Sequence, residues 1–128
     1  MKFISPRFHG YLDFVVVALF ALAPTLFGFT GLPMILSYVL AAIHLTLTLT
    51  TAFPIGLVKL VPFPIHGWLE LAVSLFLASA PWILGFADQT NAKIFYVASG
   101  ILIFGVFMTT DYKAAESDPA SHPKPSPT

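Results

Sequence analysis

The sequence contains no cysteine and very few charged residues, and both features limit the classes of protein to which the chain can belong. Without cysteine, the 128-residue chain can form no disulfide or iron–sulfur cluster and has no thiol for catalysis. Charged residues make up only 9% of the chain, whereas soluble domains carry about 25% because their surface faces water. The net charge is zero and no basic cluster is present, which argues against nucleic-acid binding. We therefore expect most of the outer surface to face lipid.

Long apolar runs are what the sequence does have. A bilayer core of about 30 Å needs roughly 20 apolar residues in a helix, and four runs are suitable: about 8–27, 33–53, 65–84 and 92–110. Turns rich in glycine and proline separate them. The sequence predicts an all-α membrane protein with one four-helix transmembrane domain over residues 1–112. The polar, proline-rich residues 113–128 have nothing to bury and are predicted to form a disordered tail.

The distribution of lysine and arginine predicts the orientation. If both termini are cytoplasmic, that side carries Lys2, Arg7, Lys59, Lys113 and Lys124, and the far side carries only Lys93. Cytoplasmic loops are enriched in these residues, so we expect both termini and the tail to be cytoplasmic.

The first and third apolar runs are related in sequence. When the chain is shifted by 57 residues, residues 8–29 align with residues 65–86 without a gap, and nine aligned positions are identical. Asp13 aligns with Glu70, and Thr50-Thr51 matches Thr109-Thr110 in the other two runs. The sequence therefore predicts two tandem two-helix hairpin repeats, about 5–53 and 63–112. Each repeat crosses the membrane twice, so a pseudo-two-fold axis along the membrane normal would relate the copies.

The stretch HGWLELAVSLFLASAPWILGF resembles the SPW-repeat integral membrane proteins of bacteria, in which a Ser-Pro-Trp motif lies near the end of a membrane helix. The resemblance covers residues 8–112. Its motif positions are Pro81, Trp82, Gly85 and Phe86 in the second copy and Pro24, Gly28 and Phe29 in the first. Ala80 and Ala23 occupy the serine position, and Thr25 replaces the tryptophan of the first copy. The resemblance implies paired helices in a bacterial inner membrane and no particular activity.

Two histidine–carboxylate pairs occupy equivalent positions in the repeats. His9 and Asp13 are four residues apart and share a helix face, as do His66 and Glu70. The predicted axis places both pairs at one depth on the cytoplasmic side. The pairs could form a clasp, in which each carboxylate orients its own histidine and the pairs lock the hairpins together. Alternatively, they could relay protons or ions, or bind a metal.

His44 breaks the internal symmetry, because its counterpart in the fourth run is apolar. It lies near the midpoint of the second run, in a stripe of small and polar residues formed by Ser37, Ala41, His44, Thr48 and Thr51. One interpretation is a neutral histidine that hydrogen-bonds Thr48 or a facing backbone carbonyl. The other is a functional group at the bilayer midplane.

Three classes of function remain open. The preferred one is a small structural or accessory membrane protein that is not an enzyme, since the chain has no pattern typical of nucleophilic catalysis. A transporter or channel subunit would use the two pairs and His44 as a proton or ion path, and a redox protein would bind haem or metal. His44 has no second histidine at its predicted depth, so we expect no cofactor and no bound metal. The expected partner is the lipid bilayer, and self-association or a membrane-protein partner stays open.

Overall fold

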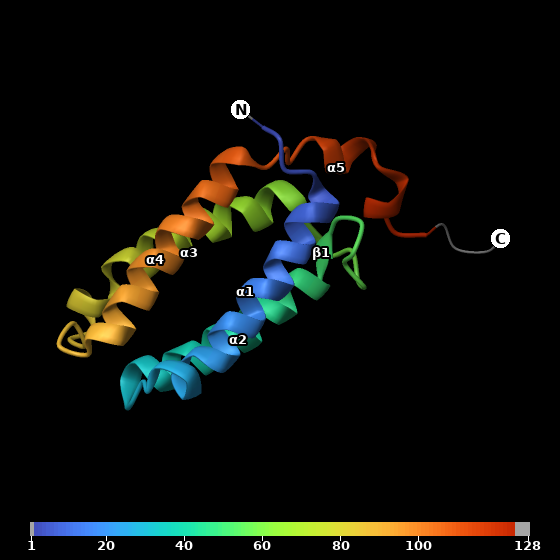
Figure 1. Ribbon diagram of the computed structural model, residues 1–128. Helices are drawn as coiled ribbons and strands as arrows, with labels where there is room; N and C mark the ends of the chain where they lie inside the picture. The colour runs from blue at the N-terminus through green and yellow to red at the C-terminus, as the bar shows by residue number, and fades with distance from the viewer. Residues whose placement is uncertain (1, 125–128) are drawn as a thin grey trace.

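The computed structural model describes residues 2–124, and residues 1 and 125–128 lie outside the described part (Figure 1). Its elements are α1 (Pro6–Phe27), α2 (Leu32–Leu49), β1 (Thr51–Ala52), β2 (Val61–Pro62), α3 (Phe63–Ile83), α4 (Thr90–Thr109), α5 (Ala114–Ser117) and a 3₁₀ helix (Pro119–Ser121). Each of α1 to α4 is long and apolar enough to cross a membrane, which confirms the predicted all-α membrane fold. Except at the end of α2, these helices begin and end within two residues of the predicted bounds.

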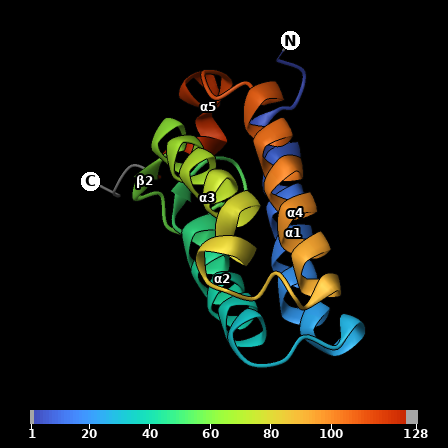
Figure 2. The same ribbon diagram turned by 90° about the vertical axis from the view of Figure 1, so that its left-hand side faces the viewer.

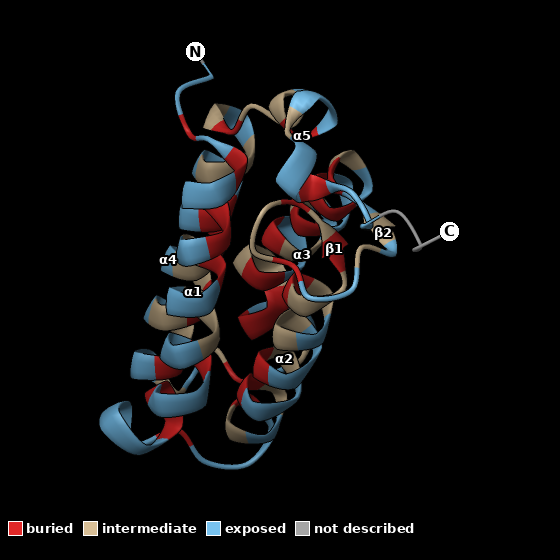
Figure 3. Cartoon of the chain, turned by 90° about the vertical axis from the view of Figure 1, so that its right-hand side faces the viewer, coloured by how far each residue is buried: buried red, intermediate tan, exposed pale blue. Residues whose placement is uncertain are grey.

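The long helices form two antiparallel hairpins, α1–α2 and α3–α4, which lie side by side (Figures 1 and 2). Both hairpin turns are at one end of the molecule, and the first and last residues that the structure describes, 2 and 124, are at the other (Figure 1). Buried residues line the surface between the hairpins, and exposed residues cover the outside (Figure 3). We call the end that carries residues 2 and 124 the inner end and the opposite one the outer end; which of them faces the cytoplasm stays a prediction.

The helix-ending motif of the repeats has a direct structural cause. Gly28 follows α1 with a φ of 71°, a left-handed conformation that glycine adopts without steric cost. This turn lets the Phe29 N–H donate to the Pro24 carbonyl, 3.0 Å away, and directs the Phe29 ring into the core. Residues 81–86 repeat the arrangement, with a corresponding bond of 2.8 Å.

The outer half of the molecule has a closed, mainly aromatic core. Tyr96 of α4 is completely buried, and its ring packs against Phe20 of α1 and near Leu77 of α3. The Tyr96 hydroxyl lies 2.8 Å from the Pro33 carbonyl oxygen and 2.9 Å from Ser37 Oγ, so its polar atom is satisfied. These contacts join the hairpins at the outer end.

A glycine allows the two helices of the second hairpin to approach closely. A Cβ atom at Gly100 of α4 would lie 2.6 Å from the carbonyl oxygen of Ser74 and 2.8 Å from the backbone nitrogen of Ala78, both in α3. Small residues at such crossings let membrane helices pack backbone against backbone. Gly100 therefore sets the spacing between α3 and α4.

The second helix ends four residues earlier than predicted. It ends at Leu49, and the chain then turns so that Thr51 and Phe53 enter the interior, where neither is exposed to solvent. Thr51 and Ala52 form β1, which pairs in parallel with β2. The prediction of a helix through Phe53 was wrong. By leaving the helix after Leu49, the chain buries Thr51 and Phe53 at the inner end, and a continuing helix would not make these contacts.

The segment that follows α4 also differs from the prediction. In place of a disordered tail, α5 and the 3₁₀ helix fold back over the inner end (Figure 1). Ala115 of α5 is 4% exposed because it packs against Phe53 and Phe63. The predicted disorder of residues 125–128 concerns residues outside the described part. The structured tail helps to cover the candidate site described next.

Candidate functional site

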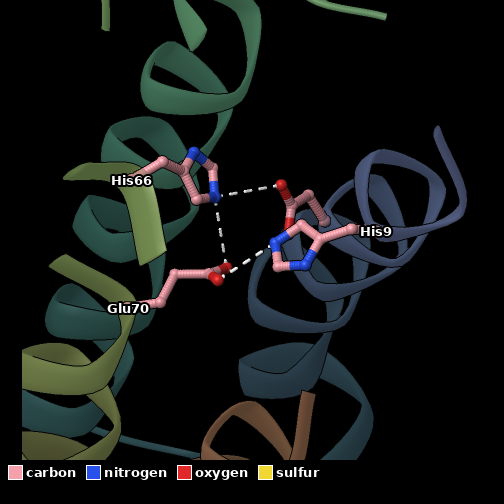
Figure 4. A group of neighbouring side chains, drawn as sticks. His9, His66 and Glu70 are labelled. Carbon is pink, nitrogen blue, oxygen red and sulfur yellow. Dashed lines mark ion pairs between the residues drawn. The ribbon is translucent and has the colours of Figure 1, made fainter. Parts of the chain in front are cut away.

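All five ionisable residues singled out in the sequence lie together between the hairpins. The cluster consists of His9 and Asp13 from α1, His44 from α2, and His66 and Glu70 from α3. Figure 4 shows three of them pointing toward one another across the gap between helices. His9 and His66 have no exposed surface, and Asp13 and Glu70 are only 2% and 3% exposed. Five ionisable side chains are thus concentrated in the inner half of an apolar molecule.

Contacts in the cluster cross from one hairpin to the other. His9 Nε2 lies 3.0 Å from Glu70 Oε2 (Figure 4). His66 Nε2 lies 3.2 Å from Asp13 Oδ2. The contacts within each helix are 3.3 Å for His9 with Asp13 and 3.3 Å for His66 with Glu70. The expectation that each pair closes on itself is therefore corrected, because each of these histidines contacts both carboxylates.

His44 belongs to the same cluster. Its Nε2 lies 3.4 Å from Asp13 Oδ1 and 3.9 Å from Glu70 Oε1, and its side chain is 14% exposed. The expected bond to Thr48 is not formed by the ring: the Thr48 hydroxyl donates to the backbone carbonyl of His44 at 2.8 Å. Because α2 ends at Leu49, His44 is nearer the inner end than the midplane position predicted for it, and this brings it level with the carboxylates.

Two threonines determine which nitrogen of the buried histidines carries a proton. His9 Nδ1 lies 2.8 Å from Thr110 Oγ1, and that hydroxyl donates its only proton to the Val106 carbonyl at 2.6 Å. The Thr110 oxygen must therefore accept a hydrogen bond from Nδ1–H. The same reasoning holds for His66, because Thr51 Oγ1 lies 2.7 Å from its Nδ1 and donates to a carbonyl of α2 at 2.6 Å. Both histidines consequently direct Nε2 at the carboxylates.

The Nε2 atoms of the three histidines have no hydrogen-bond partner among the described residues. Carboxylate oxygens lie 3.0 to 3.4 Å from each of them, but none of these contacts has the near-linear N–H···O geometry of a hydrogen bond. A buried polar nitrogen without a partner is costly, especially where no water reaches it. The ring nitrogens point into the space shared by the carboxylates rather than at one oxygen.

Aromatic rings close the cluster at the inner end, and the glycines after the two histidines make room for them. A Cβ at Gly10 would clash first with the Ile55 side chain and would lie 2.7 Å from the Phe53 ring. A Cβ at Gly67 would lie 2.6 Å from the Tyr112 ring. The Tyr112 hydroxyl reaches Glu70 Oε2 at 3.5 Å. Burial, and secondarily the Glu70 carboxylate, raises the pKa of Tyr112, so its hydroxyl stays protonated and can donate. The His-Gly dipeptides therefore serve a packing need as well as a chemical one.

One pair of equivalent residues of the predicted repeats lies in direct contact. The imidazole rings of His9 and His66 are 5.4 Å apart in the cluster. Residues contact their own symmetry mates only near a two-fold axis. This contact favours the predicted pseudo-two-fold axis between the hairpins, although the internal duplication itself stays a prediction.

Two small cavities flank the carboxylates. Each has a volume of about 50 Å³. His44 and Glu70 provide the ionisable wall of one, and Asp13 and Glu70 that of the other, and the remaining lining of both is aliphatic or phenylalanine. The site can thus hold a water molecule or a small ion beside the carboxylates.

Sequence reasoning missed the two threonines and Tyr112 as parts of the site. Thr110 had appeared only as a matching position of the predicted repeats, and Thr51 also as the last residue of the polar stripe that contains His44. Their spacing was the available signal, because a polar residue repeated at the same end of two membrane helices suggests a shared polar partner.

A comparison with protein-family models places the chain in a family. The model of the SPW repeat domain matches residues 7–110, which include the cluster and all four long helices except the first residue of α1. The chain belongs to the SPW-repeat family. In this SPW-repeat protein the Ser-Pro-Trp position is occupied by Ala80-Pro81-Trp82, near the end of α3. No curated protein and no solved structure matches the chain.

Proposed function

We propose that this small integral membrane protein is a structural or accessory component of the bacterial inner membrane without catalytic activity, and that the histidine–carboxylate cluster joins its two hairpins. The observation that carries the proposal is the crossed pattern of contacts, in which His9 reaches Glu70 at 3.0 Å and His66 reaches Asp13 at 3.2 Å. Each carboxylate is held from both hairpins, so separating the hairpins would leave buried charges without partners.

The pattern of helix packing supports this role. Most helix contacts lie within the α1–α2 and α3–α4 hairpins, and far fewer cross between them. In a bilayer the hydrophobic effect does not drive helices together, because lipid tails are as apolar as leucine. Polar contacts between hairpins therefore carry more of the association than they would in water. The cluster provides these contacts in the inner half, and Tyr96 with Ser37 provides them in the outer half.

The size of the cavities supports a role without catalysis. Small-molecule sites are clefts of about 300–1,000 Å³ that are lined by a few convergent polar groups. The two cavities beside the cluster measure about 50 Å³ each, and aromatic side chains cover the cluster at the inner end. An organic substrate would have to displace several packed side chains to reach the carboxylates.

A transport path receives less support than a role of the cluster in joining the two hairpins, which we call the joint. An ion or proton that crosses the molecule needs polar groups or water at successive depths. Outward from the cluster the interior is filled by Phe20, Leu77 and Ile103, which belong to one apolar core. The next buried polar group is Ser74, one turn outward from Glu70, and its hydroxyl donates to the Leu71 carbonyl of its own helix at 2.7 Å. Further outward lies the pair of Ser37 and Tyr96, whose hydroxyls are bonded to each other and to a backbone carbonyl.

The outer surface supports association with lipid, and the charge bias supports the proposed orientation. Large apolar side chains such as Leu22, Ile43, Leu75 and Ile101 are more than half exposed, as a lipid-facing surface requires. The excess of lysine and arginine at the inner end favours cytoplasmic termini. Part of the exposed apolar surface could also contact a second copy or another membrane protein.

A double-mutant cycle across the hairpins tests the joint. His9→Ala and Glu70→Gln should each lower the free energy of unfolding in mixed micelles, and their coupling energy should be about 1–3 kcal/mol because the side chains contact each other directly. The matched control combines His9→Ala with Glu116→Gln, which changes an exposed carboxylate. The effects of these two substitutions on the free energy of unfolding should be additive. If His9 and Glu70 are also additive, the cluster does not join the hairpins.

A further inference from the structure

We propose that the cluster binds one divalent transition-metal cation, through Nε2 of the three histidines and the carboxylates of Asp13 and Glu70. This inference rests on the proposed function, because the cation would complete the joint between the same two hairpins. His9, Asp13, His66 and Glu70 each offer a ligand atom within 4.8 Å of all the others, and His44 adds a third imidazole. The expectation of no metal assumed that His44 lay alone at its depth, and the structure removes that assumption.

The spacing of the donor atoms fits a shared cation. Ligand atoms that are each about 2.1 Å from one cation and separated by roughly 90–110° lie about 3.0–3.4 Å from one another. Five of the nitrogen–oxygen distances in the cluster are 3.0, 3.2, 3.3, 3.3 and 3.4 Å. The sixth, from His44 to Glu70, is 3.9 Å, which suits ligands on more widely separated sides of the ion.

The orientation of the imidazoles also favours a cation. With Nδ1–H of His9 and His66 donating to Thr110 and Thr51, the neutral ring presents the lone pair of Nε2 to the carboxylates. Two acceptors facing each other in a dry site repel, and a cation between them turns that repulsion into coordination. Metal-bound histidines generally donate their other ring N–H to such a partner, which fixes the tautomer and the ring orientation.

The charge of the site matches a divalent ion. The two carboxylates carry two negative charges when ionised, and among residues 2–124 no lysine or arginine forms an ion pair with them. The remaining titratable group that faces them is the hydroxyl of Tyr112. When the histidines are neutral, these two charges are uncompensated and expensive in an apolar environment, and one divalent cation would neutralise them without a further protein group.

The donor set indicates the class of metal. Imidazole nitrogens suit zinc, iron, copper and nickel, and manganese accepts mixed nitrogen and carboxylate ligands. Calcium and magnesium prefer oxygen ligands only, so three histidines argue against them. The cavities beside Asp13 and Glu70 leave room for a water molecule as an additional ligand.

Titration with Co²⁺ tests the proposal. Full-length protein without a polyhistidine tag is purified in mild detergent, stripped with a chelator and titrated while the visible absorption of bound Co²⁺ is recorded, with Zn²⁺ as competitor. We expect saturation at one Co²⁺ per chain and displacement by Zn²⁺. Asp13→Asn and Glu70→Gln should weaken binding more than about 100-fold, since loss of an outer partner alone costs about 10–100-fold. His122→Gln, which changes a histidine outside the cluster, should leave binding unchanged.

A second set of variants keeps every proposed metal ligand and removes only the threonine hydroxyls that orient two of the histidines. Thr110→Val and Thr51→Val remove the hydroxyls that orient His9 and His66 and should each weaken Co²⁺ binding by about 10–100-fold. Thr46→Val is the matched control, because the Thr46 hydroxyl donates to a helix carbonyl at 2.9 Å and contacts no histidine. Should a ligand variant fail to fold, these threonine variants decide the question.

The outcomes separate this inference from the proposed joint. The metal site is overturned if the wild-type protein binds no Co²⁺. It is also overturned if Asp13→Asn and Thr110→Val bind Co²⁺ as tightly as the wild-type protein does. The double-mutant cycle of His9 and Glu70 is performed in the presence of chelator. If His9 and Glu70 are coupled but the protein binds no Co²⁺, only the metal site is overturned. If the protein binds Co²⁺ but the two residues are not coupled in the presence of chelator, only the metal-free joint is overturned.

Discussion

Replacing Glu70 by glutamine is expected to lower the free energy of unfolding by about 3–5 kcal/mol, the range found when one partner of a buried ionic group is removed. Glutamine keeps the shape of the side chain but removes a negative charge that His9 and His66 approach at 3.0 and 3.3 Å. Equilibrium unfolding in mixed micelles, followed by circular dichroism, measures the effect.

The control for this substitution is Glu116→Gln, which makes the same chemical change at an exposed position of α5. Substitutions at exposed positions usually change stability by less than about 0.5 kcal/mol. If Glu70→Gln has an effect as small as Glu116→Gln, the carboxylate is not part of an interaction that holds the fold together.

The second large effect is expected for Gly100→Ala, which should destabilise the protein by about 3 kcal/mol, the upper part of the usual range for overpacking. The added Cβ would lie 2.6 Å from the Ser74 carbonyl oxygen and 2.8 Å from the Ala78 nitrogen. Both are backbone atoms, which cannot rotate away as a side chain could. The helices α3 and α4 would have to separate, and the same unfolding experiment would report the cost.

Gly105→Ala, five residues further along α4, is the matched control. A Cβ at Gly105 would have no heavy atom of the rest of the protein within 4 Å, so the substitution should be neutral or stabilise the helix by up to about 1 kcal/mol. Equal effects at the two glycines would show that α3 and α4 do not pack as closely as the structure indicates.

The fold could be predicted because lipid imposes strong requirements on sequence. Four apolar runs of suitable length, separated by turns, leave little choice but four spanning helices, and the structure confirms them. The proline and glycine residues of the repeat motif were also informative, because their backbone preferences are local. Gly28, one of these motif residues, directly follows the end of α1 with a φ of 71°.

The end of α2 and the fate of the tail were harder to predict, because tertiary contacts decide both. Nothing in the local sequence shows that Phe53 leaves the helix to pack against Phe63 and Ala115. The length of α2 in turn sets the depth of His44. An error of four residues in one helix end therefore changed an isolated midplane histidine into a member of the cluster.

The members of the site could be identified from sequence, but their connections could not. Ionisable residues are rare enough in membrane helices that His9, Asp13, His66 and Glu70 stood out at once. Spacing along a helix identifies partners four residues apart on the same helix, so the sequence favoured pairs within α1 and within α3. The crossed contacts depend on how the two hairpins face each other, which only the structure shows.

The joint and the metal site are two consequences of one arrangement. Two histidines anchored at Nδ1 present Nε2 to a pair of carboxylates held from opposite hairpins. With protons on Nε2, the cluster is a set of ion pairs, and with a divalent cation it becomes a coordination site. Both states join the hairpins, and both require the anchoring by Thr110 and Thr51.

The most direct test of this arrangement is the ¹⁵N NMR spectrum of the histidine side chains in the full-length protein, reconstituted in lipid bilayers without metal. The account predicts a protonated Nδ1 for both His9 and His66. It also predicts that Thr110→Val shifts only the His9 Nδ1 signal and that Thr51→Val shifts only that of His66. An unprotonated Nδ1 at either residue, or signals that neither threonine substitution moves, would contradict the anchoring on which the joint and the metal site both depend.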